Sequence, residues 1–192
     1  MIFLASRSPR RQELLAQLKV TFDVMDVDVH EQRQEGETPW DYVNRVAREK
    51  AGAGLLQLAG SPGAVVLGAD TDVVLDGTVL GKPEGPEQAF SMLRALSGRT
   101  HEVITAVWLM SAGQEAHRVV GSRVRFADVS DDEIRSYIAT GEPFGKAGAY
   151  AVQGQGAAFI ESIEGSYSGV MGLPVHETYQ LLKQFHVPVW PK

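Results

Sequence analysis

The chain of 192 residues contains no cysteine. Disulfide bonds, a thiolate nucleophile and a thiolate zinc site are therefore excluded, and the absence favours a cytosolic protein. Basic residues are also few, because 18 Lys and Arg stand against 24 Asp and Glu, a formal charge of −6. A surplus of positive charge that could displace counterions from nucleic acid is thus missing. The chain shows neither an opening signal pattern nor an apolar run of membrane-spanning length. We expect a soluble, cytoplasmic protein that binds neither nucleic acid nor membrane.

The hydrophobic content of 44% is enough for one sizeable core or for two small lobes around a cleft. Helix and strand patterns alternate, which predicts an α/β or mixed α+β fold. Helices are predicted over Ser8–Leu18, Pro39–Leu58, Pro86–Leu96, Asp131–Ala139 and Val175–Phe185. Strands are predicted over Ile2–Ala5, Thr21–Val27, Val65–Val74, Val103–Leu109, Arg118–Phe126, Ala149–Gln153 and Ala158–Ile163. The dipeptide Asp76–Gly77 predicts a hairpin, which argues against a purely parallel sheet.

A carboxylate stands beside one of these apolar runs. The run Ala64–Leu67 predicts a buried strand and puts Asp70 at its end. A carboxylate in such a place is costly unless it is exposed, hydrogen-bonded or close to a cation. Asp70 is therefore a candidate active-site residue. Asp72 would share its face if the segment stays extended.

A second polar cluster lies near the N-terminus. Ser8 is a suitable N-cap and Pro9 suits the first helical position. Arg10 and Arg11 then fall in the first turn, where the helix dipole disfavours each exposed cation by about 0.3–1 kcal/mol. A bound anion would reverse that sign, and the Ser6 and Ser8 hydroxyls could join the guanidinium groups in a phosphate site. The alternative is a solvated basic turn.

Lysines provide further candidate phosphate ligands. Lys82 follows the predicted hairpin, and its ammonium suits polyphosphate oxygens as a point charge. Taken alone, Lys82 is better interpreted as a solvated turn residue. Lys50 lies in a predicted helix with Arg45 and Arg48, and most charges on such a helix coat its surface. The pattern by itself does not separate these three residues.

Successive motifs over nearly the whole chain resemble the Maf family of nucleotide pyrophosphatases. The matching segments are Leu4–Leu15, Arg48–Ala51, Gly68–Thr71, Gly81–Pro83, Leu96–His101, Lys146–Gly154 and Gly165–Pro174. The resemblance implies a mixed α/β fold related to inosine triphosphate pyrophosphatases. It also implies a single Maf-like domain over residues 1–192, with two lobes flanking a nucleotide cleft.

The segment Lys146–Tyr150 followed by Gln153 resembles the branch of the family that acts on dTTP and UTP. The resemblance associates Arg10, Thr71 and Gln153 with substrate selection. A glutamine amide offers a donor and acceptors that match the imide edge of uracil or thymine, although it could read other bases.

The reaction implied is hydrolysis of the α–β phosphoanhydride, which gives a nucleoside monophosphate and pyrophosphate. Asp70 would act as the general base. Mg²⁺ or Mn²⁺ would bridge phosphate oxygens and one or two carboxylates, with Asp70 and Glu31 as the candidate ligands. Asp72 is an alternative second carboxylate, and the other interpretation of the acidic stretch around Glu31 is surface charge. The residues expected to bind the phosphates are Ser6, Ser8, Arg11, Lys50 and Lys82.

Two other functions remain open from the sequence. One is a nucleotide-binding regulator of cell division and septum formation without significant catalysis, which would not need a carboxylate at position 70. The other is a house-cleaning hydrolase for modified pyrimidine triphosphates, such as those of 5-methyluridine or pseudouridine. A homodimer is a candidate assembly for each function.

Overall fold

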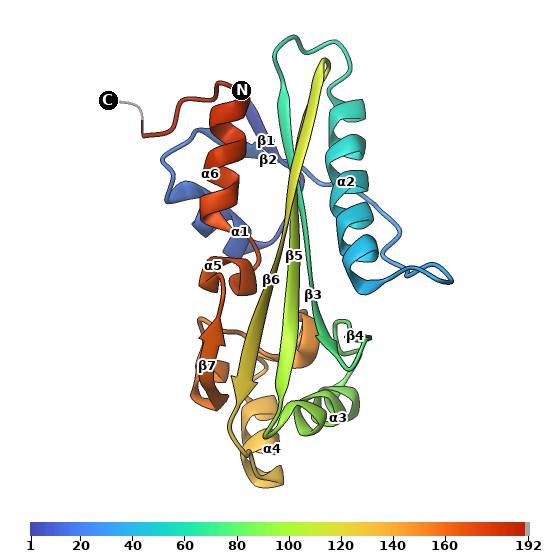
Figure 1. Cartoon of the computed structure of the whole chain (residues 1–192), viewed down its shortest axis with the longest axis vertical. Coiled ribbons are helices and arrows are strands. Elements are labelled where there is room, and N and C mark those ends of the chain that lie inside the picture. Colours follow the sequence, from blue (N-terminus) through green and yellow to red (C-terminus); the bar gives the residue numbers. More distant parts are fainter. Residues whose placement is uncertain (191–192) are drawn as a thin grey trace. The chain divides into compact units, whose positions relative to one another are not determined.

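The computed structural model describes residues 1–190. Within that range the fold is mixed α/β, as predicted, with six α-helices, two 3-10 helices and seven strands (Figure 1). The strands are β1 (Ile2–Leu4), β2 (Phe22–Val24), β3 (Val65–Leu75), β4 (Thr78–Leu80), β5 (Thr100–Ser111), β6 (Gln114–Phe126) and β7 (Ile160–Glu164). The helices are α1 (Pro9–Ala16), α2 (Pro39–Gln57), α3 (Pro86–Leu96), α4 (Asp131–Ala139), η1 (Ala147–Ala149), η2 (Gln155–Phe159), α5 (Tyr167–Met171) and α6 (Val175–Gln184).

The strands form one mixed sheet in the order β2-β1-β3-β5-β6-β7, and β4 pairs with β3. Strand β1 is parallel to β2 and β3, with Leu4 opposite Leu67. Strands β3 and β4 pair antiparallel, with Val74 opposite Val79. The Asp76–Gly77 turn joins these two strands, so the predicted hairpin is confirmed.

Local capping explains where two of the helices begin. The Thr38 hydroxyl accepts a hydrogen bond from the Asp41 N–H at 3.2 Å, which caps the N-terminus of α2. At the start of α4, Ser130 and Glu133 form a reciprocal capping box. Each interaction satisfies backbone donors that would otherwise lack a partner in the first turn.

The chain divides into two compact units. Unit 1 comprises residues 1–70, 105–120 and the chain from Gly172 onward, and unit 2 comprises 71–104 and 121–171. Within unit 1, Figure 1 shows α2 on one side of the strands and α1 and α6 on the other. Leu4, Leu15, Leu67 and Leu181 are fully buried in unit 1.

Unit 2 has a core of its own. Helices α3 and α4 contact each other, and apolar side chains from both helices pack against the strands of this unit. The most deeply buried members of the cluster include Ala89, Leu96, Val124, Phe126 and Ile134. This core supports the turns that carry the candidate residues of unit 2.

One predicted strand in unit 2 is wrong and another is partly right. The predicted strand Ala149–Gln153 is instead η1 followed by a turn. Gly148 and Ala149 have φ angles of 68° and 62°, in the left-handed region, which a strand cannot accommodate. The prediction for Ala158–Ile163 is partly right, because η2 occupies its first residues and β7 begins at Ile160. The short helix α5 was not predicted.

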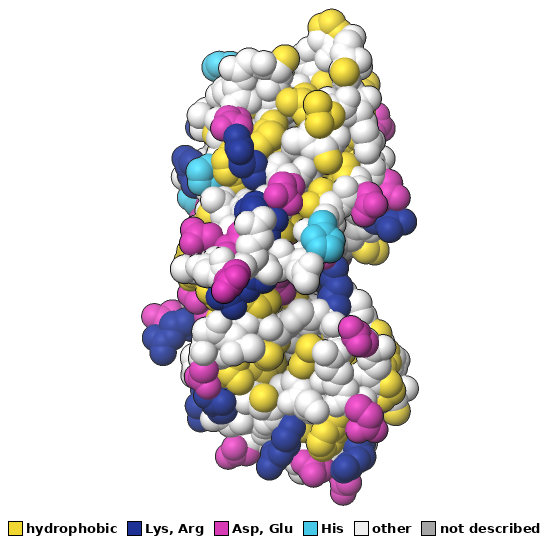
Figure 2. Space-filling model, turned by 90° about the vertical axis from the view of Figure 1, so that its right-hand side faces the viewer, with side chains coloured by type: hydrophobic (Ala, Val, Ile, Leu, Met, Phe, Trp, Pro, Cys, Tyr) yellow, Lys and Arg dark blue, Asp and Glu magenta, His cyan; other side chains and the backbone are white. Residues whose placement is uncertain are grey.

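Charges of both signs are mixed on the surface. On the face drawn in Figure 2, Lys and Arg side chains lie among Asp and Glu side chains. The ion pair between Arg48 and Glu115, at 3.1 Å, is one example. A search of the described helices finds none with the length and apolar character needed to cross a membrane.

Candidate active site

Asp70 lies inside β3, because the strand continues through it to Leu75. The predicted strand Val65–Val74 also contained Asp70, and only the expectation that the strand ends beside this residue is wrong. The residue is 7% exposed. Lys50 of α2 donates a hydrogen bond from Nζ to Asp70 Oδ1 at 2.7 Å. The ammonium group compensates the burial of the carboxylate.

A second carboxylate contacts the same lysine. Glu31, in the loop between β2 and α2, has its Oε1 atom 2.6 Å from Lys50 Nζ. The side chain of Glu31 is 38% exposed, whereas the side chain of Asp70 is 9% exposed. Two carboxylates from different segments therefore converge on one buried ammonium group. Of the three cationic residues of α2 that the helix pattern alone did not separate, Lys50 is the one that contacts both carboxylates, and it is also the one that the family resemblance singled out.

Gly68 permits the close approach of β3 to α2 that brings Lys50 and Asp70 together. A Cβ atom at Gly68 would lie 2.5 Å from the carbonyl oxygen of Ala47 and 2.5 Å from the backbone nitrogen of Ala51. Both atoms belong to the backbone of α2, which cannot move aside as a flexible side chain can. An isolated glycine within a strand pattern is a known indication of such an approach, but our sequence interpretation did not use it.

The N-terminal cluster is organised around Ser6. The Ser6 Oγ atom accepts hydrogen bonds from the Ser8 N–H at 3.3 Å and from Arg11 Nη1 at 3.2 Å. Arg11 also donates from Nε to the carbonyl oxygen of Gly172 at 2.8 Å. Ser8 occupies the N-cap position as predicted, but its hydroxyl does not cap a backbone N–H of α1. The structure thus brings Ser6, Ser8 and Arg11 together.

The residues associated with substrate selection lie in both units. Arg10, in α1 of unit 1, is half-buried, and this burial lowers the pKa of its guanidinium group below the usual value. Thr71 is half-buried in β3, while Lys82 and Gln153 are exposed in unit 2. The N–H of Gly148 donates to the carbonyl oxygen of Gly81 at 3.1 Å. This bond connects the turn that holds Lys82 to η1, four residues before Gln153.

Glu142 organises the turn that carries Gln153, and sequence reasoning missed it. Its carboxylate accepts hydrogen bonds from the Tyr137 hydroxyl at 2.7 Å and from the N–H groups of Gln155 and Gly156 at 2.9 and 3.0 Å. Burial by itself raises the pKa of Glu142, but the hydrogen bonds from Gly156, Gln155 and Tyr137 outweigh it and the net pKa is lowered. Sequence reasoning missed Glu142 because no sequence pattern distinguishes a structural glutamate in a loop after a helix from a solvated surface glutamate.

The pair of carboxylates at Lys50 fits a divalent cation of the hard, oxygen-binding type. Mg²⁺ is usually bound through one or two carboxylates together with substrate phosphates and water. Asp70 and Glu31 supply two carboxylates that lie close together, because one oxygen of each contacts the same Lys50 ammonium group. The described residues contain no cluster of three or more His, Asp or Glu that could hold a metal by themselves. A site completed by substrate oxygens is therefore the arrangement that these residues could support.

Solved structures with a related arrangement share little sequence with this chain. A nucleoside-triphosphatase/dITP/XTP pyrophosphatase from Mycobacterium abscessus matches 67% of this chain and 75% of that chain, with a TM-score of 0.43 and 16% identity. The Ham1 protein of Staphylococcus aureus gives a TM-score of 0.41 over 68% of this chain and 72% of that chain, also at 16% identity. At this distance the likeness supports no conclusion about the site.

Sequence relatives are much closer. A protein of Xanthomonas euvesicatoria named dTTP/UTP pyrophosphatase is 56% identical over 187 residues, which cover 96% of this chain and 98% of that protein. A Xylella fastidiosa protein named nucleoside triphosphate pyrophosphatase is 54% identical over 186 residues, with the same two coverages. The family described as Maf-like protein matches residues 1–185. From these matches we conclude that the chain belongs to the Maf family.

Proposed function

We propose that this Maf protein is a nucleoside triphosphate pyrophosphatase that hydrolyses dTTP and UTP to the nucleoside monophosphate and pyrophosphate. The observation that carries the chemistry is the buried Asp70 carboxylate, held 2.7 Å from Lys50 Nζ beside Glu31. The choice of substrates is supported by the relatives named dTTP/UTP pyrophosphatase, at 55–56% identity over nearly the full chain.

In this proposal Asp70 accepts a proton from the water that attacks phosphorus. A carboxylate is a suitable general base when its position is fixed, and the contact with Lys50 restricts the Asp70 side chain. Positive charge is needed as well, because the water approaches a polyanion. The residues proposed to bind the phosphates are Ser6, Ser8, Arg11, Lys50 and Lys82.

Asp70 and Glu31 are the residues that would hold Mg²⁺ or Mn²⁺. When bound, such an ion would neutralise charge on the phosphate oxygens of the substrate. Lys50 keeps the two carboxylates close to each other, since its ammonium group contacts both of them.

Arg10, Thr71 and Gln153 are proposed to select the pyrimidine nucleotide. Gln153 is exposed and can present both amide groups to a base. The same amide would accept pyrimidine bases modified at positions away from the imide edge, so modified triphosphates belong to the proposed substrate class. The proposal keeps the chain as one Maf-like domain and places the enzyme in the cytoplasm, where nucleoside triphosphates are made and used.

The experiment measures pyrophosphate release from a panel of nucleoside triphosphates with Mg²⁺ or Mn²⁺, for the wild type, Asp70→Asn and Asp72→Asn. Asp72 is the comparison because it lies two residues further along β3, is also 7% exposed and is the alternative second carboxylate. We expect turnover of dTTP and UTP, and a loss of about 10²–10⁴-fold in kcat for Asp70→Asn, the size typical of losing a general base, with a smaller loss for Asp72→Asn. Nucleotide binding by Asp70→Asn should persist.

Two results would count against this proposal. Equal losses in both variants would remove the distinction between Asp70 and another buried carboxylate of the strand. A wild type that binds nucleotides and cleaves none of them would favour the regulatory alternative. That alternative is not favoured at present, because the relatives carry the names of hydrolases.

A further inference from the structure

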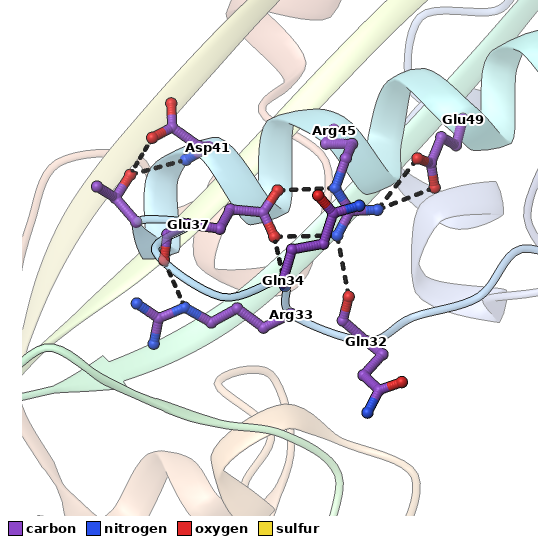
Figure 3. A network of polar contacts seen from close by, with 8 residues as sticks. Gln32, Arg33, Gln34, Glu37, Asp41, Arg45 and Glu49 are labelled. Atoms are coloured by element: carbon purple, nitrogen blue, oxygen red, sulfur yellow. Dashed lines mark hydrogen bonds and ion pairs between the residues drawn. The ribbon is translucent and has the colours of Figure 1, made fainter.

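Glu31 reaches the active-site lysine from a loop that has no regular structure of its own. Residues 25–38 connect β2 to α2, and most of them are exposed. A loop of this kind does not hold a carboxylate in place without outside contacts. Gln57 of α2 contacts the loop near its start, at Asp26. Arg45 of α2 contacts it on the far side of Glu31, at Gln32 and Glu37, as Figure 3 shows.

Arg45 joins the loop to the helix at two points. Its Nε and Nη2 atoms donate to the two oxygens of Glu37 at 2.7 and 3.0 Å, a bidentate contact. Nη2 also donates to the carbonyl oxygen of Gln32, the residue after Glu31, at 3.0 Å. The planar guanidinium group suits such a fork of acceptors, and a lysine could not reproduce it.

Glu37 in turn closes the second half of the loop. Its Oε2 atom accepts from the N–H of Gln34 at 3.0 Å, and its carbonyl oxygen accepts from Arg33 Nε at 2.7 Å. The hydrogen bond from Arg45 lowers the pKa of Glu37, and the same contact raises the pKa of Arg45, so both groups are ionised at neutral pH. The loop is therefore folded back on itself around a charged centre.

This arrangement differs from the other ion pairs on α2. The Arg45 and Glu37 side chains are 22% and 10% exposed, whereas those of Arg48 and Glu115 are 56% and 51% exposed. Arg45 also contacts Glu49 at 3.1 Å, but this is an ordinary i,i+4 pair within the helix. Only the contacts with Glu37 and Gln32 act on the loop.

We propose that Arg45 and Glu37 are positioning residues of the active site, which hold the loop so that Glu31 stays at Lys50. The inference rests on the proposed hydrolase function, because it gives Glu31 a part in that chemistry. Neither Arg45 nor Glu37 touches the substrate in this proposal. Both act through the loop that carries the second carboxylate.

The test compares Arg45→Gln and Glu37→Gln with two matched controls in the full-length enzyme. Arg48→Gln removes the same charge from the same helix, and Glu49→Gln removes the partner of Arg45 that lies within the helix. We would measure amide hydrogen exchange in peptides covering residues 25–38, steady-state kinetics with dTTP, and the Mg²⁺ concentration for half-maximal activity. Thermal unfolding would report on the remainder of the fold.

For Arg45→Gln and Glu37→Gln we expect about tenfold faster exchange in the loop, the size that one or two charge-assisted hydrogen bonds imply. We also expect about a tenfold loss of kcat and about a tenfold rise in the Mg²⁺ requirement, as supporting residues of a metal site typically give. The double variant should show the same exchange rate and the same loss of kcat as Arg45→Gln, because both single changes break the contact between Arg45 and Glu37. Arg48→Gln and Glu49→Gln should stay within about twofold of the wild type in all three measurements.

Unchanged loop exchange in both Arg45→Gln and Glu37→Gln would overturn the inference, as would equal effects in Glu49→Gln. If Arg45→Gln destabilises the whole fold, Glu37→Gln decides the matter, because it leaves the contacts within α2 intact. If the wild type hydrolyses none of the nucleotides, the proposed function fails. The exchange measurement would then still show whether these two residues hold the loop.

Discussion

Acidification should destabilise this protein through His101, which is buried against Tyr150 and Phe126. The residue is 3% exposed, and its Nε2 atom lies 2.8 Å from the Tyr150 hydroxyl. Its ring packs edge-on against Phe126 and Tyr150, with centroids 5.1 and 5.5 Å apart. Nδ1 has no hydrogen-bond partner among the described residues. Burial lowers the pKa of His101 from 6.5 to about 4.

The direction of the pH effect on the free energy of unfolding follows from which state of the protein binds the proton. As the pH falls below 6.5, the unfolded chain protonates this histidine while the folded protein does not, so the free energy of unfolding decreases until about pH 4. At about 1.4 kcal/mol per pH unit, the whole interval corresponds to about 3 kcal/mol. Between pH 7 and pH 5 the share of His101 is about 2 kcal/mol.

The measurement is urea unfolding followed by tryptophan fluorescence at pH 7 and pH 5, for the wild type, His101→Gln and His176→Gln. Carboxylates titrate in all three proteins, so the difference in pH dependence isolates the histidine. We expect His101→Gln to lose about 2 kcal/mol less than the wild type on acidification. His176 is exposed on α6, and its variant should follow the wild type. Equal pH dependence in all three proteins would refute the reasoning.

Two further predictions concern the packing at Asp70. Lys50→Met should lower the free energy of unfolding by about 3–5 kcal/mol, because it leaves the buried Asp70 carboxylate without its cation. Asp70→Asn should lower the free energy of unfolding by less, since Lys50 keeps its contact with Glu31. A larger loss for Asp70→Asn than for Lys50→Met in urea unfolding would contradict this reasoning. Gly68→Ala should cost at least about 1–3 kcal/mol and reduce dTTP turnover, because the new Cβ meets backbone atoms of α2 at 2.5 Å. Gly52→Ala is the control in the same urea-unfolding and kinetic assays, since a Cβ at Gly52 meets nothing within 4 Å. This variant should leave the free energy of unfolding unchanged or raise it.

The beginnings of helices could be predicted because they depend on neighbouring residues. Proline is the first residue of α1, α2 and α3, as the sequence indicates, and Ser130 caps α4. The Asp76–Gly77 hairpin was equally local, since its turn is formed by two residues with φ angles of 50° and 75°. Such features need no knowledge of distant segments.

The errors arose where distant packing decides the backbone. The apolar residues of Ala149–Gln153 resemble a strand, but Gly148 lies against Val73, and a Cβ at Gly148 would meet the atoms of that side chain at 2.9–3.0 Å. The backbone turns there in the left-handed region instead of extending. Helix α5 has five residues, which is too short for a periodic pattern to be visible.

The sequence by itself determined the class of fold, most helix positions, the family and the set of candidate residues, because short motifs and local turn chemistry encode these properties. Only the tertiary structure decided which charges meet. Lys50 rather than Arg45 or Arg48 contacts Asp70, although 20 residues separate the pair along the chain. That choice depends on how α2 packs against β3 at Gly68, and no spacing in the sequence specifies the rotation of a helix on a strand. The same packing leaves Arg45 directed at the loop of Glu31.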